Sequence, residues 1–193
     1  MKPLITPHNE PDWETHDIET VYDNPWITVT HRNVSAPTGT RGIYGMVHFK
    51  NLALGVVPID ADGNTWLVGQ QRYTLSHYAW EIPEGGGLRD VDPLITAKRE
   101  LREETGIEAK RWTPLLTLHT SNSVTDEVAH AFIAQGLSFG ETETDDTERL
   151  AIVKLPLEEA VARVMSGEIT DALAMASLLK AQRLIDTGEL SIN

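Results

Sequence analysis

The sequence contains no cysteine. This absence excludes disulfide bonds, a thiolate nucleophile and any zinc site built on cysteine. The sequence also has no run approaching the ~18 consecutive apolar residues of a membrane-spanning helix, and its first residues lack the apolar stretch of a secretory signal. We therefore expect a protein without a membrane partner, and a cytoplasmic location is the simplest interpretation.

Basic residues are scarce, with 16 Lys and Arg against 29 Asp and Glu, for a formal net charge of -13. Such a surface repels nucleic-acid backbones, so nucleic acid is not expected as a partner. It also repels a free polyphosphate. If the substrate carries phosphate, a carboxylate cluster that holds divalent metal would supply the missing positive charge.

The first half of the 193-residue chain is predicted to form strands, because β-branched and aromatic residues partly alternate there with polar ones. An Asp-Gly pair favours a hairpin turn near residue 62. The predicted strands are Ile18–Tyr22, Trp26–Val34, Ile43–Phe49, Leu52–Ile59 and Thr65–Val68. The length fits one domain with a small N-terminal extension.

The second half mixes helices and strands. A helix is predicted to start with Asp92 as N-cap and Pro93 at its first position, and to end at Gly106. Its buried stripe would be Leu94, Ala97 and Leu101. Two helices are expected near the end of the chain. The other predicted elements are the strands Thr113–Leu118, Val128–Ala134 and Leu150–Leu155 and the helices Leu157–Ser166 and Asp171–Asp186.

Three carboxylates gather on one side of the first helix. At about 100° per residue, Glu104 lies about 40° from Glu100, and Glu103 lies about 60° to the other side. A divalent cation would turn their mutual repulsion into coordination, and oxygen ligands favour magnesium or manganese over zinc. The alternative is a solvated helix of mixed charge, in which Arg99 and Glu103 form an ordinary surface pair.

The context of the helix favours the metal site. A triple glycine, Gly85–Gly87, stands just upstream. We expect these residues to form a loop whose backbone can approach a phosphate or offer a carbonyl to a metal. The order strand, glycine loop, helix would place this loop and the carboxylates on one rim.

The segment from Gly85 to Ile107 resembles the Nudix box. Eight of its nine fixed positions match, from Gly85 through the run Arg99-Glu100-Leu101-Arg102-Glu103-Glu104-Thr105-Gly106-Ile107. Val91 departs from the motif, because the family usually has glutamate there. The preceding Gln70–Tyr73 and Trp80–Gly86 look like the corresponding segments of ADP-ribose and nucleotide-sugar pyrophosphatases.

The resemblance implies an α/β fold, the Nudix α/β/α sandwich with a mixed sheet and an N-terminal antiparallel strand region. Residues 1–47 would form the strand region and residues 48–193 the hydrolase domain. The pyrophosphatases that the sequence resembles are typically homodimers, in which N-terminal strands contribute to the substrate pocket of the partner. A homodimer is therefore implied here.

The resemblance also implies the metal ligands. Glu100 and Glu104 would bind magnesium, with manganese as the alternative, and Glu103 would be a ligand or a close support. The backbone carbonyl of Glu84 would be a further ligand. Arg99 would orient the glutamates through a charge-assisted hydrogen bond.

The catalytic base is harder to place, because in this group it often lies on a loop far from the box. The candidates are Glu148, Asp146 and Glu127, each of which could instead be a solvated surface carboxylate. We favour Glu148, because it just precedes the Leu150 strand, where the pyrophosphatases that the sequence resembles have their loop acid. A base must reach its water at ~2.6–3.2 Å.

Four residues are candidates for substrate contacts. Arg72 could bind phosphate with its planar guanidinium, or be a surface arginine. Glu81 could bind the base or ribose, or be a solvated strand carboxylate. Trp26 or Tyr44 could stack on the nucleobase from the partner subunit, although Trp26 fits core or interface packing better.

The implied reaction is metal-assisted attack of water on a diphosphate. ADP-ribose comes first among the expected substrates, and other nucleoside diphosphate sugars such as GDP-mannose follow. The products would be a nucleoside monophosphate and a sugar phosphate. The alternative is a non-catalytic sensor that binds a nucleotide sugar, which Val91 favours and the intact run Arg99–Glu104 opposes.

Overall fold

The computed structural model describes residues 12–142 and 150–192. The chain divides into two compact units, which are described separately. The first contains the residues up to Lys50 together with Ser121–Asp126, and the second contains Asn51–Thr120 and the residues from Glu127 onward. Within the described ranges, no helix is both long and apolar enough to cross a membrane.

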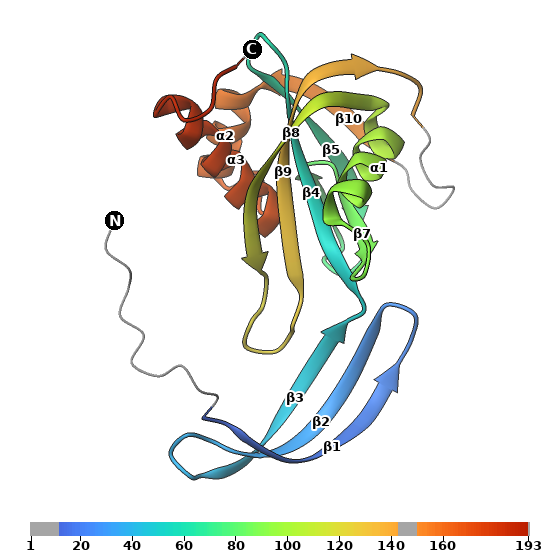
Figure 1. The fold of residues 1–193 in the computed structure, drawn as a ribbon, viewed down its shortest axis with the longest axis vertical. Helices are drawn as coiled ribbons and strands as arrows, with labels where there is room; N and C mark the ends of the chain where they lie inside the picture. The colour runs from blue at the N-terminus through green and yellow to red at the C-terminus, as the bar shows by residue number, and fades with distance from the viewer. Residues whose placement is uncertain (1–11, 143–149, 193) are drawn as a thin grey trace. The chain divides into compact units, whose positions relative to one another are not determined.

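The first unit is an antiparallel sheet of three strands in the order β1-β2-β3 (Figure 1). The strands are β1 (Glu14–Asp23), β2 (Ile27–Ser35) and β3 (Arg41–Phe49). The segment Ser121–Asp126 lies against β3, where the Val47 N–H donates to the Val124 carbonyl at 2.9 Å. The strands predicted in this region are confirmed, although β1 extends further at both ends than the sequence indicated.

The second unit is built on a mixed sheet in the order β7-β4-β9-β8. Strands β4 and β9 are parallel, and the other neighbours are antiparallel. Its strands are β4 (Asn51–Ile59), β7 (Glu84–Leu88), β8 (Ile107–His119) and β9 (Val128–Phe139). A smaller antiparallel sheet has the order β10-β5-β6, from β5 (Asn64–Arg72), β6 (His77–Glu81) and β10 (Ala151–Pro156).

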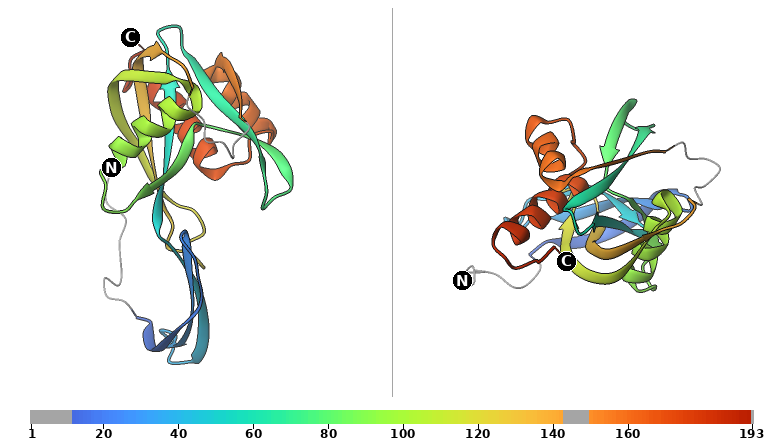
Figure 2. Two further views of the ribbon diagram at one scale, coloured as in Figure 1. Left: turned by 90° about the vertical axis from the view of Figure 1, so that its right-hand side faces the viewer. Right: turned by 90° about the horizontal axis from the view of Figure 1, so that it is seen from above.

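Helices cover both faces of the mixed sheet. Helix α1 (Pro93–Thr105) lies on one face, and α2 (Leu157–Ser166) and α3 (Ala172–Asp186) lie on the other (Figures 1 and 2). Alternate residues of β4 enter different cores: Val56 packs in the cluster that contains Leu101 of α1, and Val57 in the cluster that contains Leu178 of α3. The predicted α/β/α sandwich is confirmed.

Local signals fix the ends of α1. The Asp92 carboxylate accepts a hydrogen bond from the Leu94 N–H at 2.9 Å, as an N-cap does. Gly106 has a φ of 69° and donates its N–H to the Arg102 carbonyl at 2.8 Å. Both predicted boundaries are confirmed. Of the predicted buried stripe, Ala97 and Leu101 are fully buried, and Leu94 packs partly buried against the same core cluster.

Two predictions about the strands need correction. Gly85–Gly87 do not form a loop, because they lie in β7, where Gly85 pairs with Leu54 of β4. Strand β8 begins at Ile107, directly after the helix, and not at Thr113. Exposed charged residues at the start of β8 hide its strand character in the sequence, because this strand lies at the edge of the sheet.

Candidate active site

Two glutamates of α1 are buried although their side chains are polar and ionisable. Glu100 is 9% exposed and Glu104 is 4% exposed. Their helix packs against β7, where a side chain at Gly85 would overlap the Glu100 carboxylate. A Cβ at Gly87 would lie 2.5 Å from the Thr96 hydroxyl. The glycines of β7 therefore provide the space in which these polar side chains of α1 lie.

Arg99 joins the helix to the glycine strand. Its guanidinium donates to Glu103 at 2.5 Å, to Glu100 at 2.5 Å and to the Gly86 carbonyl at 3.1 Å. The predicted positioning contact and the alternative surface pair with Glu103 are thus both present. The guanidinium holds two carboxylates and one strand carbonyl in a fixed arrangement.

Glu84, the first residue of β7, connects two parts of the site. Its backbone N–H donates to the Glu104 carboxylate at 3.0 Å, and its own carboxylate accepts from Arg72 at 3.0 Å. The sequence had suggested a role for the Glu84 carbonyl only. The side chain is a contribution that sequence reasoning missed.

Arg72 and Glu81 form a bidentate ion pair across β5 and β6. The Arg72 Nε and Nη2 atoms donate to the two Glu81 oxygens at 2.8 and 2.7 Å. Glu81 is only 3% exposed, so the alternative of a solvated strand carboxylate is wrong. The Arg72 side chain is 36% exposed and also contacts Glu84, so it is partly at the surface while it is held by two carboxylates. Its role in phosphate binding stays a prediction. The two parallel hydrogen bonds fix the orientation of the guanidinium plane.

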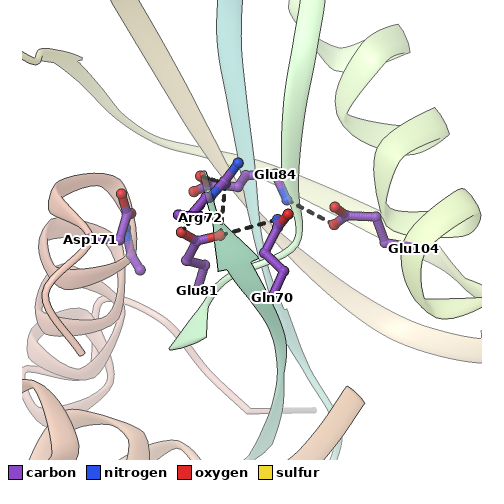
Figure 3. A network of polar contacts seen from close by, with 7 residues as sticks. Gln70, Arg72, Glu81, Glu84, Glu104 and Asp171 are labelled. Carbon is purple, nitrogen blue, oxygen red and sulfur yellow. Dashed lines mark hydrogen bonds and ion pairs between the residues drawn. The ribbon is translucent and has the colours of Figure 1, made fainter. Parts of the chain in front are cut away.

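A third acidic residue completes this group. Oxygens of Glu81, Glu84 and Asp171 all lie within 4.8 Å of one another. Asp171 is the N-cap of α3 and accepts from the Ala174 N–H at 2.7 Å. Figure 3 shows Asp171 and Glu104 approaching the group from opposite sides. The sequence marked Asp171 only as a helix start, since nothing local relates it to residues so far away along the chain.

The electrostatics of the group follow from this crowding. Burial raises the pKa of Glu84 well above its usual value, and the negative charges of Asp171 and Glu81 raise it further. Burial by itself would lower the pKa of Arg72, but the hydrogen bonds and charge of Glu81 outweigh it, and that pKa is raised. Among the described residues, Glu84 Oε2 is a buried oxygen without a hydrogen-bond partner.

The two predicted aromatic contacts belong to the first unit. Trp26, between β1 and β2, is 66% exposed, so packing in the core of this chain is wrong for it. The Tyr44 hydroxyl donates to the Ser123 carbonyl at 2.6 Å, and its ring meets Trp13 edge to face at 5.6 Å. Trp13, Tyr44 and Arg32 line a cavity of about 230 Å³.

The structure describes one of the three candidates for the catalytic base, Glu127. Glu127 lies just before β9 and accepts a hydrogen bond from the Thr120 hydroxyl at 2.5 Å. Asp146 and Glu148 lie outside the described residues. Which acid serves as base stays a prediction.

Family models match both parts of the chain. A NUDIX domain model matches residues 50–176. A model described as the nucleoside diphosphate sugar hydrolase N-terminal domain matches residues 13–47. The first match covers most of the second unit and includes the segment from Gly85 to Ile107.

Relatives and a solved structure agree with these models. The chain is 35% identical to an ADP-ribose pyrophosphatase of Mycobacterium tuberculosis, over 93% of this chain and 87% of the relative. It is 33% identical to an ADP-ribose pyrophosphatase of Bacillus subtilis, over 80% and 84%. A crystal structure of an ADP compounds hydrolase shares the fold, with a TM-score of 0.83 and 23% identity, over 95% of this chain and all of the other. The chain therefore belongs to the Nudix family of hydrolases.

Proposed function

We propose that the protein hydrolyses the diphosphate bond of ADP-ribose or a related nucleoside diphosphate sugar, giving a nucleoside monophosphate and a sugar phosphate. The observation that carries this proposal is the burial of Glu100 and Glu104 against the glycine strand β7. Arg99 donates hydrogen bonds both to Glu100 on the helix and to the Gly86 carbonyl on the strand. The names of the two relatives support the substrate class. So does the N-terminal domain model that matches residues 13–47.

The donor set fits a hard divalent cation, which Nudix hydrolases generally use. Every charged side chain at the site that could bind a metal is a carboxylate, and cysteine is absent from the chain. The space left by Gly85 is occupied by the Glu100 carboxylate, and Glu84 keeps an unpartnered oxygen. Glu100 and Glu104 would hold magnesium, or manganese, with Glu103 and the Glu84 carbonyl in support. The bound cation would supply charge neutralisation for a diphosphate.

The protein's own residues would position the substrate and the carboxylates. Arg99 keeps Glu100 and Glu103 in one orientation through its paired hydrogen bonds. Arg72, oriented by Glu81, would present its guanidinium to a phosphate oxygen. Glu148 is our first choice of base, with Asp146 and Glu127 as alternatives, and a cytoplasmic location stays a prediction from the sequence.

A substrate panel tests the proposed reaction. ADP-ribose, GDP-mannose and a nucleoside triphosphate would be incubated with magnesium and with EDTA, and the phosphorylated products separated by anion exchange. We expect AMP and ribose 5-phosphate from ADP-ribose only when magnesium is present. Tight binding of a nucleotide sugar without turnover of any panel member would favour the sensor alternative and reject the enzyme.

We also propose that residues 1–47 mediate a homodimer and contribute Trp26 or Tyr44 to the partner's substrate pocket. Exposed apolar side chains on the first unit support this, since β1 is exposed along its whole length and Ile43 is 69% exposed. Light scattering of the wild-type protein and of Ile43→Asp tests the assembly. A monomeric mass for the wild-type protein would contradict it.

A further inference from the structure

A concave surface on the second unit lies on a side of α1 away from Glu100 and Glu104. It is a cavity of about 350 Å³ lined by Lys98, Arg99, Arg102, Glu108, Ala109 and Trp112. This volume lies within the roughly 300–1,000 Å³ of small-molecule sites. On a helix, Lys98 and Arg102 share one side, about 160° from the side of Glu100 and Glu104. The cavity therefore opens on a different side of α1 from the carboxylate site, and Arg99 is the residue that the two share.

The charge of this lining is opposite to that of the whole protein. Three of its side chains are cationic and one is acidic, whereas the chain carries a net charge of -13. Lys110 and Arg111 follow directly on β8. At physiological salt, charges interact over about 8 Å. An anion at the cavity is therefore attracted by these nearby cations, whereas its repulsion by more distant acidic residues is screened. Arginine and lysine are the side chains that bind phosphate.

The rest of the lining favours a nucleotide over free phosphate. The Trp112 indole is half-buried, its Nε1 donates to the Ala109 carbonyl at 3.1 Å, and Lys98 Nζ lies 5.8 Å from the ring centroid. Because the indole nitrogen is occupied, the ring offers the cavity an apolar surface suited to a base. The Glu108 carboxylate would repel phosphate, but it can accept hydrogen bonds from ribose hydroxyls.

We propose that this cavity is a second binding site for a nucleoside monophosphate, with the phosphate on Lys98 and Arg102 and the base against Trp112. Arg99 lines the same cavity while it holds Glu100 and Glu103. A phosphate there competes with Glu103 for the guanidinium and disturbs the carboxylates. Binding of the product at this site would thus slow the enzyme. This inhibition rests on the proposed function, whereas the binding itself does not.

The binding test uses the full-length protein in EDTA, which removes cations that could recruit phosphate to the carboxylates. Trp112 is one of five tryptophans, and its indole N–H signal in a ¹H–¹⁵N spectrum is assigned with Trp112→Phe. AMP, adenosine and inorganic phosphate are titrated at constant ionic strength. We expect a saturable shift with AMP, with a Kd on the order of 1 mM, and at least threefold weaker binding of phosphate and of adenosine.

A charge-matched control makes the result specific. Lys98→Gln/Arg102→Gln should weaken AMP binding at least tenfold. Arg41→Gln/Arg183→Gln removes two exposed cations elsewhere and should leave it unchanged. Equal weakening in both variants, or no saturable shift of Trp112, would overturn the site. Phosphate binding as tightly as AMP would overturn the contact with the base.

The consequence for turnover is measured separately with magnesium and substrate. AMP should lower kcat at least twofold in a way that excess substrate does not relieve, and Lys98→Gln/Arg102→Gln should remove this effect while keeping the uninhibited rate. Binding of AMP with an unchanged kcat would overturn the coupling through Arg99. Absence of any hydrolysis without AMP would instead reject the proposed function and leave the binding result standing.

Discussion

The backbone N–H of Glu84 donates a hydrogen bond to the carboxylate of Glu104 at 3.0 Å. This contact joins the first residue of β7 to the last turn of α1. It fixes one oxygen of Glu104 toward the strand, in a place where the side chain is almost fully buried. A buried carboxylate with a fixed hydrogen-bond partner is typical of a cation-binding site and not of a solvated surface position.

Replacing Glu104 by glutamine is the most direct test of the metal assignment. The amide keeps the shape and can still accept from the Glu84 N–H, but it removes the charge that would hold the cation. We predict a loss of about two or more powers of ten in kcat, with the circular dichroism spectrum unchanged. Glu158→Gln, an exposed position on α2, is the control. A rate near that of the wild-type protein would remove Glu104 from the site.

Gly85→Ala tests why the strand beside α1 is rich in glycine. The new methyl group would overlap the Glu100 carboxylate, so the helix must shift or Glu100 must turn away. We predict a loss of stability of about 1–3 kcal/mol and a loss of turnover larger than that of Gly86→Ala. Gly86 is a good control because its Cβ would be 3.4 Å from Asn51 Nδ2, a contact that small shifts relieve. Equal effects of the two variants would contradict this role of Gly85.

Arg72→Lys tests the paired hydrogen bonds at the acidic group. Lysine keeps the charge but cannot donate two parallel hydrogen bonds to Glu81. We predict that the free energy of unfolding falls by on the order of 1 kcal/mol, because Arg72 is partly solvent-exposed. We also predict a higher KM, measured by steady-state kinetics with ADP-ribose. Arg41→Lys, at an exposed position in β3, should change neither value. An unchanged KM would remove Arg72 from substrate binding.

The helix that carries the site could be predicted from local signals. Asp92, Pro93 and Gly106 mark its ends within a few residues, and the spacing of the apolar residues marks its buried side. The Nudix resemblance then supplied the fold, because the motif is long and specific. These features depend on residues that are close together in the sequence.

The rest of the site depends on contacts that local patterns do not encode. Asp171 joins Glu81 and Glu84 only because α3 begins beside the small sheet, and its sequence context shows an N-cap alone. Glu81 looks like a solvent-facing strand residue until its partner Arg72 is placed on the neighbouring strand. The glycines of β7 suggest a loop, since their packing against Glu100 and Thr96 is visible only in three dimensions.

Asp60 provides a pH-dependent test of stability away from the site. Burial by itself would raise the pKa of its carboxyl group, but hydrogen bonds from Lys154 and Asn64 lower that pKa from 3.8 to about 2. The side chain is 16% exposed, and Lys154 Nζ lies 2.7 Å from Asp60 Oδ2. Because the folded state has the lower pKa, the stabilisation is present above pH 3.8 and is lost as the pH falls through about 2.

We therefore predict that Asp60→Asn lowers the free energy of unfolding by about 1–2 kcal/mol at pH 7, after allowance for solvent screening. At about pH 3 the difference from the wild-type protein should shrink to roughly half, because more of the unfolded-state carboxyl is protonated there. Urea unfolding from pH 7 down to pH 3 measures this trend. Asp62→Asn, an exposed position in the same turn, controls for the amide itself. A difference that stays constant over this range would show that the carboxylate charge does not stabilise the turn.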